Sequence, residues 1–141
     1  MERVKKFINE HNTLTLATSN SGKPAAAAVF YTYVTGDNIL LFVSSKKSEH
    51  IINCNEQPNC AVTIQEDGLE WNVIKGIQLK GEISLAEEKY WNQYFEKYPY
   101  IKDDKELATA LEKVSLYKLK IKWVRLIDNS KGFGNREEYK F

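Results

Sequence analysis

Hydrophobic and polar residues alternate with a period of two along much of the chain, which is the pattern of strands with one buried face. The alternation is clearest where Leu14 and Leu16 stand between threonines. Four alanines at 25–28 favour a helix, but they lie between two turn signals and lead into a β-branched and aromatic run, so a strand is expected there. The predicted strands are residues 13–19, 25–34, 39–43, 60–65, 71–86 and 117–123.

The last predicted strand has the most regular alternation of the six. We expect its apolar face to point into the core and its lysines to face solvent. The long strand before it contains Gly76 and Gly81, which indicate bulges or bends. The two faces of the last strand consist of Tyr117, Leu119, Ile121 and Trp123, and of Lys118, Lys120 and Lys122.

Apolar residues recur at helical spacing in only four segments. Because six strands with hairpin connections outnumber these helices, the chain predicts a mainly β fold, an antiparallel barrel decorated by helices, and not an alternating α/β fold. The last two helices form an amphipathic pair joined by residues 99–104. The four segments are an opening helix with Val4, Phe7 and Ile8, a helix with Ile51 and Ile52, residues 87–98 and residues 105–114.

Composition and charge limit the number of domains, the kinds of partner and the location of the protein. A chain of 141 residues is long enough for one domain, residues 1–141, and too short for two ordinary ones. Twenty basic and nineteen acidic residues nearly cancel, so no overall field attracts nucleic acid or an anionic membrane, and anion recognition has to be local. No apolar stretch resembles a secretory signal or a transmembrane helix, so we expect a cytoplasmic protein with no membrane partner.

The two cysteines, Cys54 and Cys60, are too few for a disulfide scaffold, and we expect buried thiols. Cys54, Cys60 and His50 could together supply three ligands of a metal site. A tetrahedral zinc site needs a fourth ligand, however, and His11, the only other candidate, lies on an unrelated segment. Neither cysteine has a recognisable activating environment. We therefore expect no metal site and assign no catalytic side chain.

One turn gathers groups that can bind an anion. It joins the apolar strand 39–43 to the following helix, and a serine there is a good helix cap. Free amides at a helix start, the helix dipole and flanking lysines attract phosphate groups. Serine caps and solvated lysine pairs are also common without a ligand, so phosphate binding is a hypothesis at this stage. The turn, residues 44–50, consists of Ser44, Ser45, Lys46, Lys47, Ser48, Glu49 and His50.

The lysines of the last strand allow a second anion hypothesis, in which the barrel binds single-stranded nucleic acid. Alternating lysines also keep an exposed strand from associating with other chains, and the overall positive charge of a nucleic-acid binder is missing. We therefore expect no nucleic-acid partner. The chain also lacks the glycine-rich fingerprint of dinucleotide folds and the phosphate loop of nucleotide hydrolases.

The order of these elements resembles the FMN-binding split barrel of the pyridoxamine 5′-phosphate oxidase-like superfamily. Within it, the chain is similar to a short, functionally uncharacterised bacterial branch. The resemblance covers nearly the whole chain and implies a six-stranded antiparallel split barrel. The motifs that carry it are Phe7 and Ile8, the turn Gly22, Lys23 and Pro24, residues 44–50, Pro58, Gly81 and the tail at 128–134.

The resemblance implies a homodimer that holds FMN in a groove at its interface. The positions that match the phosphate-binding residues are Ser44, Ser45, Lys46, Lys47, Ser48 and His50. The positions that match the strand beside the flavin ring are Ala27, Ala28, Val29, Phe30, Tyr31 and Thr32. Small alanines would let a flat ring approach the backbone, although they also suit packing beneath a helix. Lys75 and Gly76 match a further cofactor-contacting stretch.

The sequence also departs from the oxidases of the family. They often carry an arginine in the second strand, where this chain has Ala27, and an arginine-lysine pair at the phosphate turn, where it has two lysines and a histidine. Lysine holds phosphate as a point charge without the bidentate fork of arginine. The tryptophan-containing C-terminal motif is missing as well. Oxidation of pyridoxamine phosphate is therefore not the expected reaction.

The leading hypothesis is a homodimeric FMN-binding flavoprotein, an oxidoreductase that acts on an unidentified small molecule. The alternative is a non-enzymatic split-barrel binder or sensor of haem or of another phosphorylated cofactor, in which His50 could serve as an axial ligand. The sequence identifies neither the substrate nor the electron donor.

Overall fold

The chain folds into eight strands and five α-helices, with three short 3₁₀ helices between them. The computed structural model describes residues 1–141. The strands are β1 Thr13–Asn20, β2 Lys23–Phe30, β3 Thr32–Val34, β4 Ile39–Ser44, β5 Asn59–Gln65, β6 Lys75–Leu85, β7 Ser115–Asp128 and β8 Arg136–Lys140. The helices are α1 Glu2–Glu10, α2 Glu49–Glu56, η1 Trp71–Val73, η2 Glu88–Tyr90, α3 Trp91–Lys97, α4 Tyr100–Asp103, α5 Lys105–Leu111 and η3 Asn129–Lys131.

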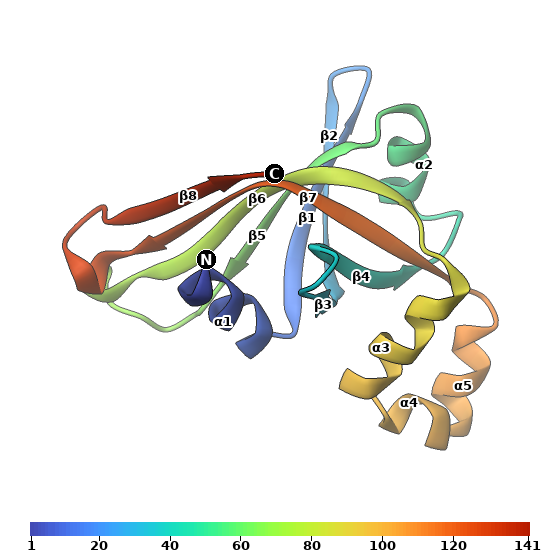
Figure 1. Cartoon of the computed structure of the whole chain (residues 1–141). Coiled ribbons are helices and arrows are strands. Elements are labelled where there is room, and N and C mark those ends of the chain that lie inside the picture. The colour runs from blue at the N-terminus through green and yellow to red at the C-terminus, as the bar shows by residue number, and fades with distance from the viewer.

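All strands belong to one antiparallel sheet with the order β2-β1-β5-β6-β7-β4-β3. The long strand β7 pairs with β6 along one edge, and along the other edge it pairs first with β4 and then with β8. The helices α3, α4 and α5 gather at one end of the sheet, and the β7–β8 turn lies at the opposite end (Figure 1). No helix has both the length and the apolar character needed to cross a membrane.

The structure confirms the predicted mainly β fold and differs from the prediction in four details. The predicted strand 25–34 is interrupted at Tyr31, which divides it into β2 and β3. Strand β8 was not predicted, because its sequence alternates charged residues and offers Tyr139 as its only apolar side chain. Residues 71–73 form a 3₁₀ turn instead of the start of β6, and the short helix α4 forms within the connection 99–104.

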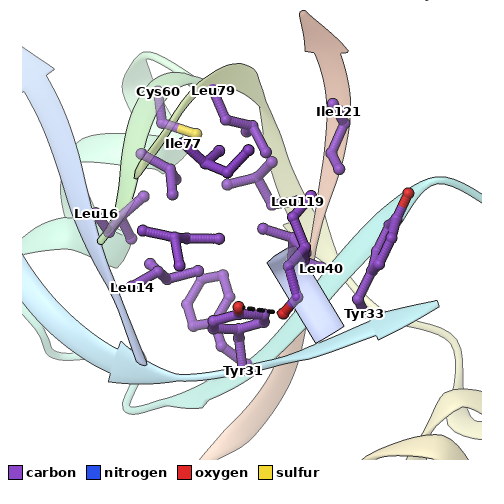
Figure 2. Packing of buried hydrophobic residues seen from close by; sticks show 14 of the residues in the cluster. Leu14, Leu16, Tyr31, Tyr33, Leu40, Cys60, Ile77, Leu79, Leu119 and Ile121 are labelled. Carbon is purple, nitrogen blue, oxygen red and sulfur yellow. Dashed lines mark hydrogen bonds between the residues drawn. The ribbon is translucent and has the colours of Figure 1, made fainter. Parts of the chain in front are cut away.

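A cluster of 22 buried residues fills the interior of the curled sheet. Leu14 and Leu16 of β1 contribute to it together with Leu79 of β6 and Leu119 of β7 (Figure 2). The cluster also includes Val4, Phe7 and Ile8 of α1, as predicted. Both cysteines are buried in the same cluster, as expected, and burial raises the pKa of the Cys54 thiol to about 11 and that of Cys60 to about 12. Neither is a thiolate at neutral pH.

Tyr31 lies where the chain leaves β2 at one edge of the sheet and enters β3 at the other. Its side chain is completely buried, and its hydroxyl donates to the carbonyl oxygen of Ile8 at 2.5 Å (Figure 2). Its backbone N–H donates to Asn12 at 2.9 Å, and its carbonyl oxygen accepts from the hydroxyl of Tyr98. This one residue therefore connects α1, the start of β1, the β2–β3 junction and the end of α3.

Lys97, the last residue of α3, strengthens the same junction. Its ammonium group lies 4.5 Å from the ring centre of Tyr31 and donates to the carbonyl oxygen of His11 at 2.7 Å. Burial lowers the pKa of Lys97 to about 8. The cation–π contact and the hydrogen bond partly replace the water that burial removes.

A β-bulge shifts the register of β6 and β7 between Lys80 and Gly81. Lys80 pairs with Trp123, whereas Gly81 pairs with Ile121, so β7 carries an extra residue at this point. The prediction that Trp123 faces the core is wrong for this reason, because the bulge changes the phase of the alternation. Trp123 lies on the outer face with Lys80, while Tyr117, Leu119 and Ile121 point inward as predicted.

Gly81 is the residue that allows this close approach of β6 and β7. A Cβ atom there would lie 2.6 Å from Cδ2 of Leu119 and would also collide with the carbonyl oxygen of Lys120. We expect Gly81→Ala to lower the free energy of unfolding by about 1–3 kcal/mol, as overpacking does. Gly36→Ala is the matched control, since its Cβ would meet nothing within 4 Å. Urea denaturation measures both, and equal stabilities of the two variants would contradict this packing.

Candidate functional site

Strand β4 changes at its end from an apolar strand to a polar turn. The alternation that buries Leu40 and Phe42 continues to Ser44, so this hydroxyl is also buried. Ser44 pairs with Ser115 at the start of β7. After Ser44 the chain turns into α2. Ser48 is the residue that caps α2, as the sequence suggested, but its side chain donates to Ser45 instead of accepting from the helix.

Three predicted residues of the turn form a hydrogen-bonded cluster. The hydroxyl of Ser44 lies 2.6 Å from Nε2 of His50 and 3.0 Å from the hydroxyl of Ser48. The hydroxyl of Ser48 donates to the carbonyl oxygen of Ser45 at 2.7 Å. Each hydroxyl has one proton, so the assignment in which every bond is made has the Ser44 hydroxyl donating to Ser48 and the Nε2–H group of His50 donating to Ser44, with Ser48 a further 3.3 Å from Nε2. The cluster therefore ends in an imidazole N–H donor.

Burial lowers the pKa of His50 below its usual value, although the nearby carboxylate of Glu49 acts in the opposite direction. The imidazole is therefore neutral at neutral pH, in agreement with its role as a single N–H donor in the cluster.

The start of α2 offers further donors. The backbone N–H groups of Glu49, His50 and Ile51 donate to no acceptor within the chain. Lys46 and Lys47 are exposed and form no ion pair, and the backbone N–H of Lys47 donates to the hydroxyl of Ser45 at 3.1 Å. Free amides at a helix start and unpaired ammonium groups are what an anion needs. The turn thus combines hydroxyl, imidazole, amide and ammonium groups.

An apolar pocket of about 250 Å³ lies on the outer face of β4, just before this turn. Val43, the residue before Ser44, lines it together with Phe30 of β2 and with Tyr94 and Tyr98 of α3 and its end. The ring of Phe30 meets that of Tyr98 edge to face at 5.9 Å between centroids. The helices α4 and α5 close the far side, and every lining side chain is apolar or aromatic. One end of β4 therefore borders both an apolar pocket and a polar turn.

The predicted residues of β2 divide between two faces. Ala27 and Val29 are half-buried and pair with Leu16 and Leu14, so they share the inner face of the sheet. Ala28 and Phe30 lie on the outer face, and Phe30 is the one that reaches the pocket. The last two positions of the predicted stretch, 31 and 32, are buried in the β2–β3 junction.

The structure does not bring Lys75 to the turn within one chain. Lys75 begins β6, whereas Leu85, at the other end of that strand, lies near the turn, so roughly 30 Å of strand separates them. The ammonium of Lys75 lies 3.8 Å from the buried carboxylate of Asp128, which Arg3 contacts at 2.6 Å. Burial acts to raise the pKa of Asp128, but hydrogen bonds from Ser130 and Arg3 hold it below its usual value.

Sequence reasoning missed the walls of the pocket. The sequence predicts Tyr94 and Tyr98 on the buried face of an amphipathic helix, and both are buried. In addition, both side chains line the pocket. The helical spacing of these aromatics was visible in the sequence, whereas their placement beside Phe30 depends on the contact between Tyr98 and Tyr31.

The lowered pKa of His50 predicts a pH dependence of stability. The unfolded chain binds the proton more readily than the folded chain, so stability is lost as the pH falls below the usual histidine pKa of about 6.5. We expect His50→Gln, whose side chain can still donate to Ser44, to reduce this loss. Urea denaturation at neutral and mildly acidic pH measures it. An equal loss in both proteins would contradict the buried, neutral imidazole.

Comparison with known proteins supports the mainly β, antiparallel split-barrel fold. A UPF0306 protein of Campylobacter jejuni is 25% identical over 138 residues, which cover 98% of this chain and 96% of that protein. The structure of C. jejuni ChuZ superposes with a TM-score of 0.80 at 21% identity over 99% of this chain. The chain spans 58% of the length of ChuZ.

A second solved structure, HutZ from Vibrio cholerae, described as a haem storage protein, superposes with a TM-score of 0.69 at 20% identity. The superposition covers 86% of this chain and 89% of HutZ. The sequence model described as pyridoxamine 5′-phosphate oxidase matches residues 1–128. With this match over most of its length, and with the antiparallel split-barrel fold described above, the chain belongs to the pyridoxamine 5′-phosphate oxidase family.

Proposed function

We propose that the protein binds FMN, with the phosphate at residues 44–50 and the flavin ring in the apolar pocket beside Val43. The observation that supports this most is the adjacency of Val43 and Ser44. The first lines the pocket on the outer face of the sheet, and the second opens the polar turn on the inner face. Strand β3 pairs with β4 only as far as Leu41, so no strand pairs with the edge of β4 that separates the two. A ligand that carries a phosphate on a short chain attached to a flat apolar ring has the matching distribution of chemistry.

The groups of the turn fit a phosphate. The free N–H groups at the start of α2 and the hydroxyl of Ser45 can donate to phosphate oxygens, and those of His50 and Ser48 can do so when a phosphate oxygen replaces their acceptor within the cluster. Lys46 and Lys47 supply positive charge without an internal carboxylate to compete for it. In the proposed site, the ammonium groups of Lys46 and Lys47, together with the N–H and hydroxyl donors, replace the bidentate guanidinium group that the oxidases use.

The pocket fits part of a ring, and we propose that a second copy of the chain completes it. Its volume of about 250 Å³ is below the range of about 300–1,000 Å³ of complete ligand sites. The outer face of β1 and β2 beside Phe30 presents only small side chains, such as Thr15 and Ala28, so a partner's backbone can approach it closely. The proposal therefore includes a homodimer with the cofactor at its interface.

Bound FMN would supply electron or hydride transfer, and the proposed activity is that of an oxidoreductase on a small molecule. The residues of this chain bind and orient the cofactor and exclude water from its ring. The two free, buried thiols, Cys54 and Cys60, suit a reducing compartment such as the cytoplasm, where we place the protein.

Haem is the alternative occupant, because HutZ shares the fold. His50 belongs to the turn that follows Val43, but in the fully bonded cluster its Nε2 atom carries the proton that it donates to Ser44. Axial ligation through Nε2 would require that proton to leave and the cluster with Ser48 to rearrange. A phosphate oxygen that accepts from the same N–H group leaves the proton on His50, so this hydrogen bonding favours phosphate over iron.

Parallel titrations with FMN and riboflavin test the proposal, because the two ligands differ only in the phosphate. We expect Lys47→Gln and His50→Gln to weaken FMN binding about 10- to 100-fold, the value of one charge-assisted hydrogen bond, and riboflavin binding by much less. Flavin fluorescence gives both dissociation constants. Lys131→Gln, an exposed lysine at the far end of the sheet, is the matched control and should bind both ligands normally.

Three outcomes would contradict the proposal. FMN could fail to bind the purified protein, the two variants could lose FMN and riboflavin equally, or haem could bind with a defined absorption band in place of FMN. Light scattering during size-exclusion chromatography tests the dimer separately, and a monomer that binds FMN with full affinity would exclude completion of the site by a second copy.

A further inference from the structure

The bulge of β6 and β7 places Trp123 on the outer face of the sheet, where two cations lie close to its ring. The ammonium of Lys80 is 5.2 Å from the ring centre, and the guanidinium carbon of Arg125 is 4.9 Å from it. Both distances are within the range of a cation–π contact. Bulges often aim a side chain toward a functional surface. An indole fixed by two cations is a rigid, electron-rich platform on this face.

Trp123 lines a groove of about 530 Å³ on the outer face of the sheet, over β6 and the paired strands β7 and β8, which lie side by side in Figure 1. Lys122 and Lys140 line it together with Trp123, and Phe141, which is more than half exposed, adds a second aromatic side chain. The backbone N–H of Phe141 donates to the carbonyl oxygen of Lys122 at 3.0 Å, which fixes the aromatic beside the lysine.

The side chains of the groove carry an excess of positive charge. Its one carboxylate, that of Glu138, is bound by Arg125 at 2.6 Å, and this hydrogen bond holds the pKa of Glu138 below its usual value. Lys80, Lys122 and Lys140 form no ion pair. Because the acidic and basic residues of the whole chain nearly cancel, this gathering of uncompensated lysines is local.

We infer that this groove binds a nucleoside di- or triphosphate, with its base against Trp123 and beside Phe141, and its phosphates at Lys122 and Lys140. Aromatic side chains stack on bases, and unpaired lysines attract phosphates. A single nucleotide matches the size of the groove and the short row of lysines. An extended nucleic acid would need a longer basic track, and Lys118, which might have continued it, is bound to Glu87 at 2.5 Å.

This groove is separate from the site proposed for FMN. Trp123 lies eight residues along β7 from Ser115, the partner of Ser44, which is roughly 26 Å of strand. The two sites can therefore be tested independently, and the nucleotide site does not depend on the proposed function. His50→Gln should leave nucleotide binding unchanged.

Calorimetric titration with ATP, ADP and adenosine tests the inference. We expect ATP to bind most tightly, ADP less tightly and adenosine at least tenfold more weakly than ATP, because the lysines address the phosphates. The double variant Lys122→Gln/Lys140→Gln should weaken ATP binding at least tenfold and leave adenosine nearly unchanged. Trp123→Leu should weaken all three ligands, and Lys131→Gln is the matched control with no expected effect.

The indole N–H signals of the three tryptophans in a proton–nitrogen NMR spectrum give a readout that needs no variant. ATP should shift the signal of Trp123 and leave those of Trp71 and Trp91 in place. The inference is overturned by the absence of ATP binding at millimolar concentration, by equal loss of ATP and adenosine in the lysine variant, or by an unmoved Trp123 signal.

Two further results would assign the groove to another occupant and overturn the inference. Oligothymidylate that binds at least tenfold more tightly than ATP would indicate single-stranded nucleic acid. A change of oligomeric state in Trp123→Leu, with ATP binding unaffected, would indicate a contact between copies of the chain.

Discussion

The buried junction at Tyr31 is the constraint on which the rest of the structure depends. There the chain crosses from one edge of the sheet to the other. The fully buried side chain of Tyr31 bonds to Ile8, and its backbone N–H and carbonyl oxygen bond to Asn12 and Tyr98. A hydroxyl buried in an apolar core needs its partner, so the Tyr31–Ile8 bond fixes α1 against the junction. The Tyr98 bond fixes α3 in the same way, and with it the helices that close the pocket.

The candidate cofactor site follows from this junction and from the end of β4. The residue before Tyr31 is Phe30, which the junction directs to the pocket, and the pocket meets β4 at Val43. One residue later the sequence changes from apolar to hydroxyl-bearing, and the start of α2 leaves three amides free. Ring and phosphate chemistry therefore lie on the two faces of one strand end, with Val43 on the side of the pocket and Ser44 on the side of the polar cluster.

Local patterns in the sequence were sufficient to predict most strands, the helix α1 and the polar turn, because each depends on neighbours within a few residues. Long-range packing set the remainder. The phase of β7 after Ile121 depends on a bulge against Gly81, so alternation alone placed Trp123 on the wrong face. The pairing of Lys75 with Asp128 spans β6 and β7, and no local pattern contains it. The pocket depends on contacts of Tyr98 with residues far away in the chain, so its walls could not be predicted.

The most direct measurement of the central claim is a crystal structure of the protein grown with FMN. The account predicts phosphate oxygens within hydrogen-bond distance, about 2.7–3.2 Å, of the backbone N–H groups at the start of α2 and of the imidazole of His50. It also predicts the flavin ring against Phe30 and Val43. A phosphate bound away from residues 44–50, or a ring outside the apolar pocket, would contradict it.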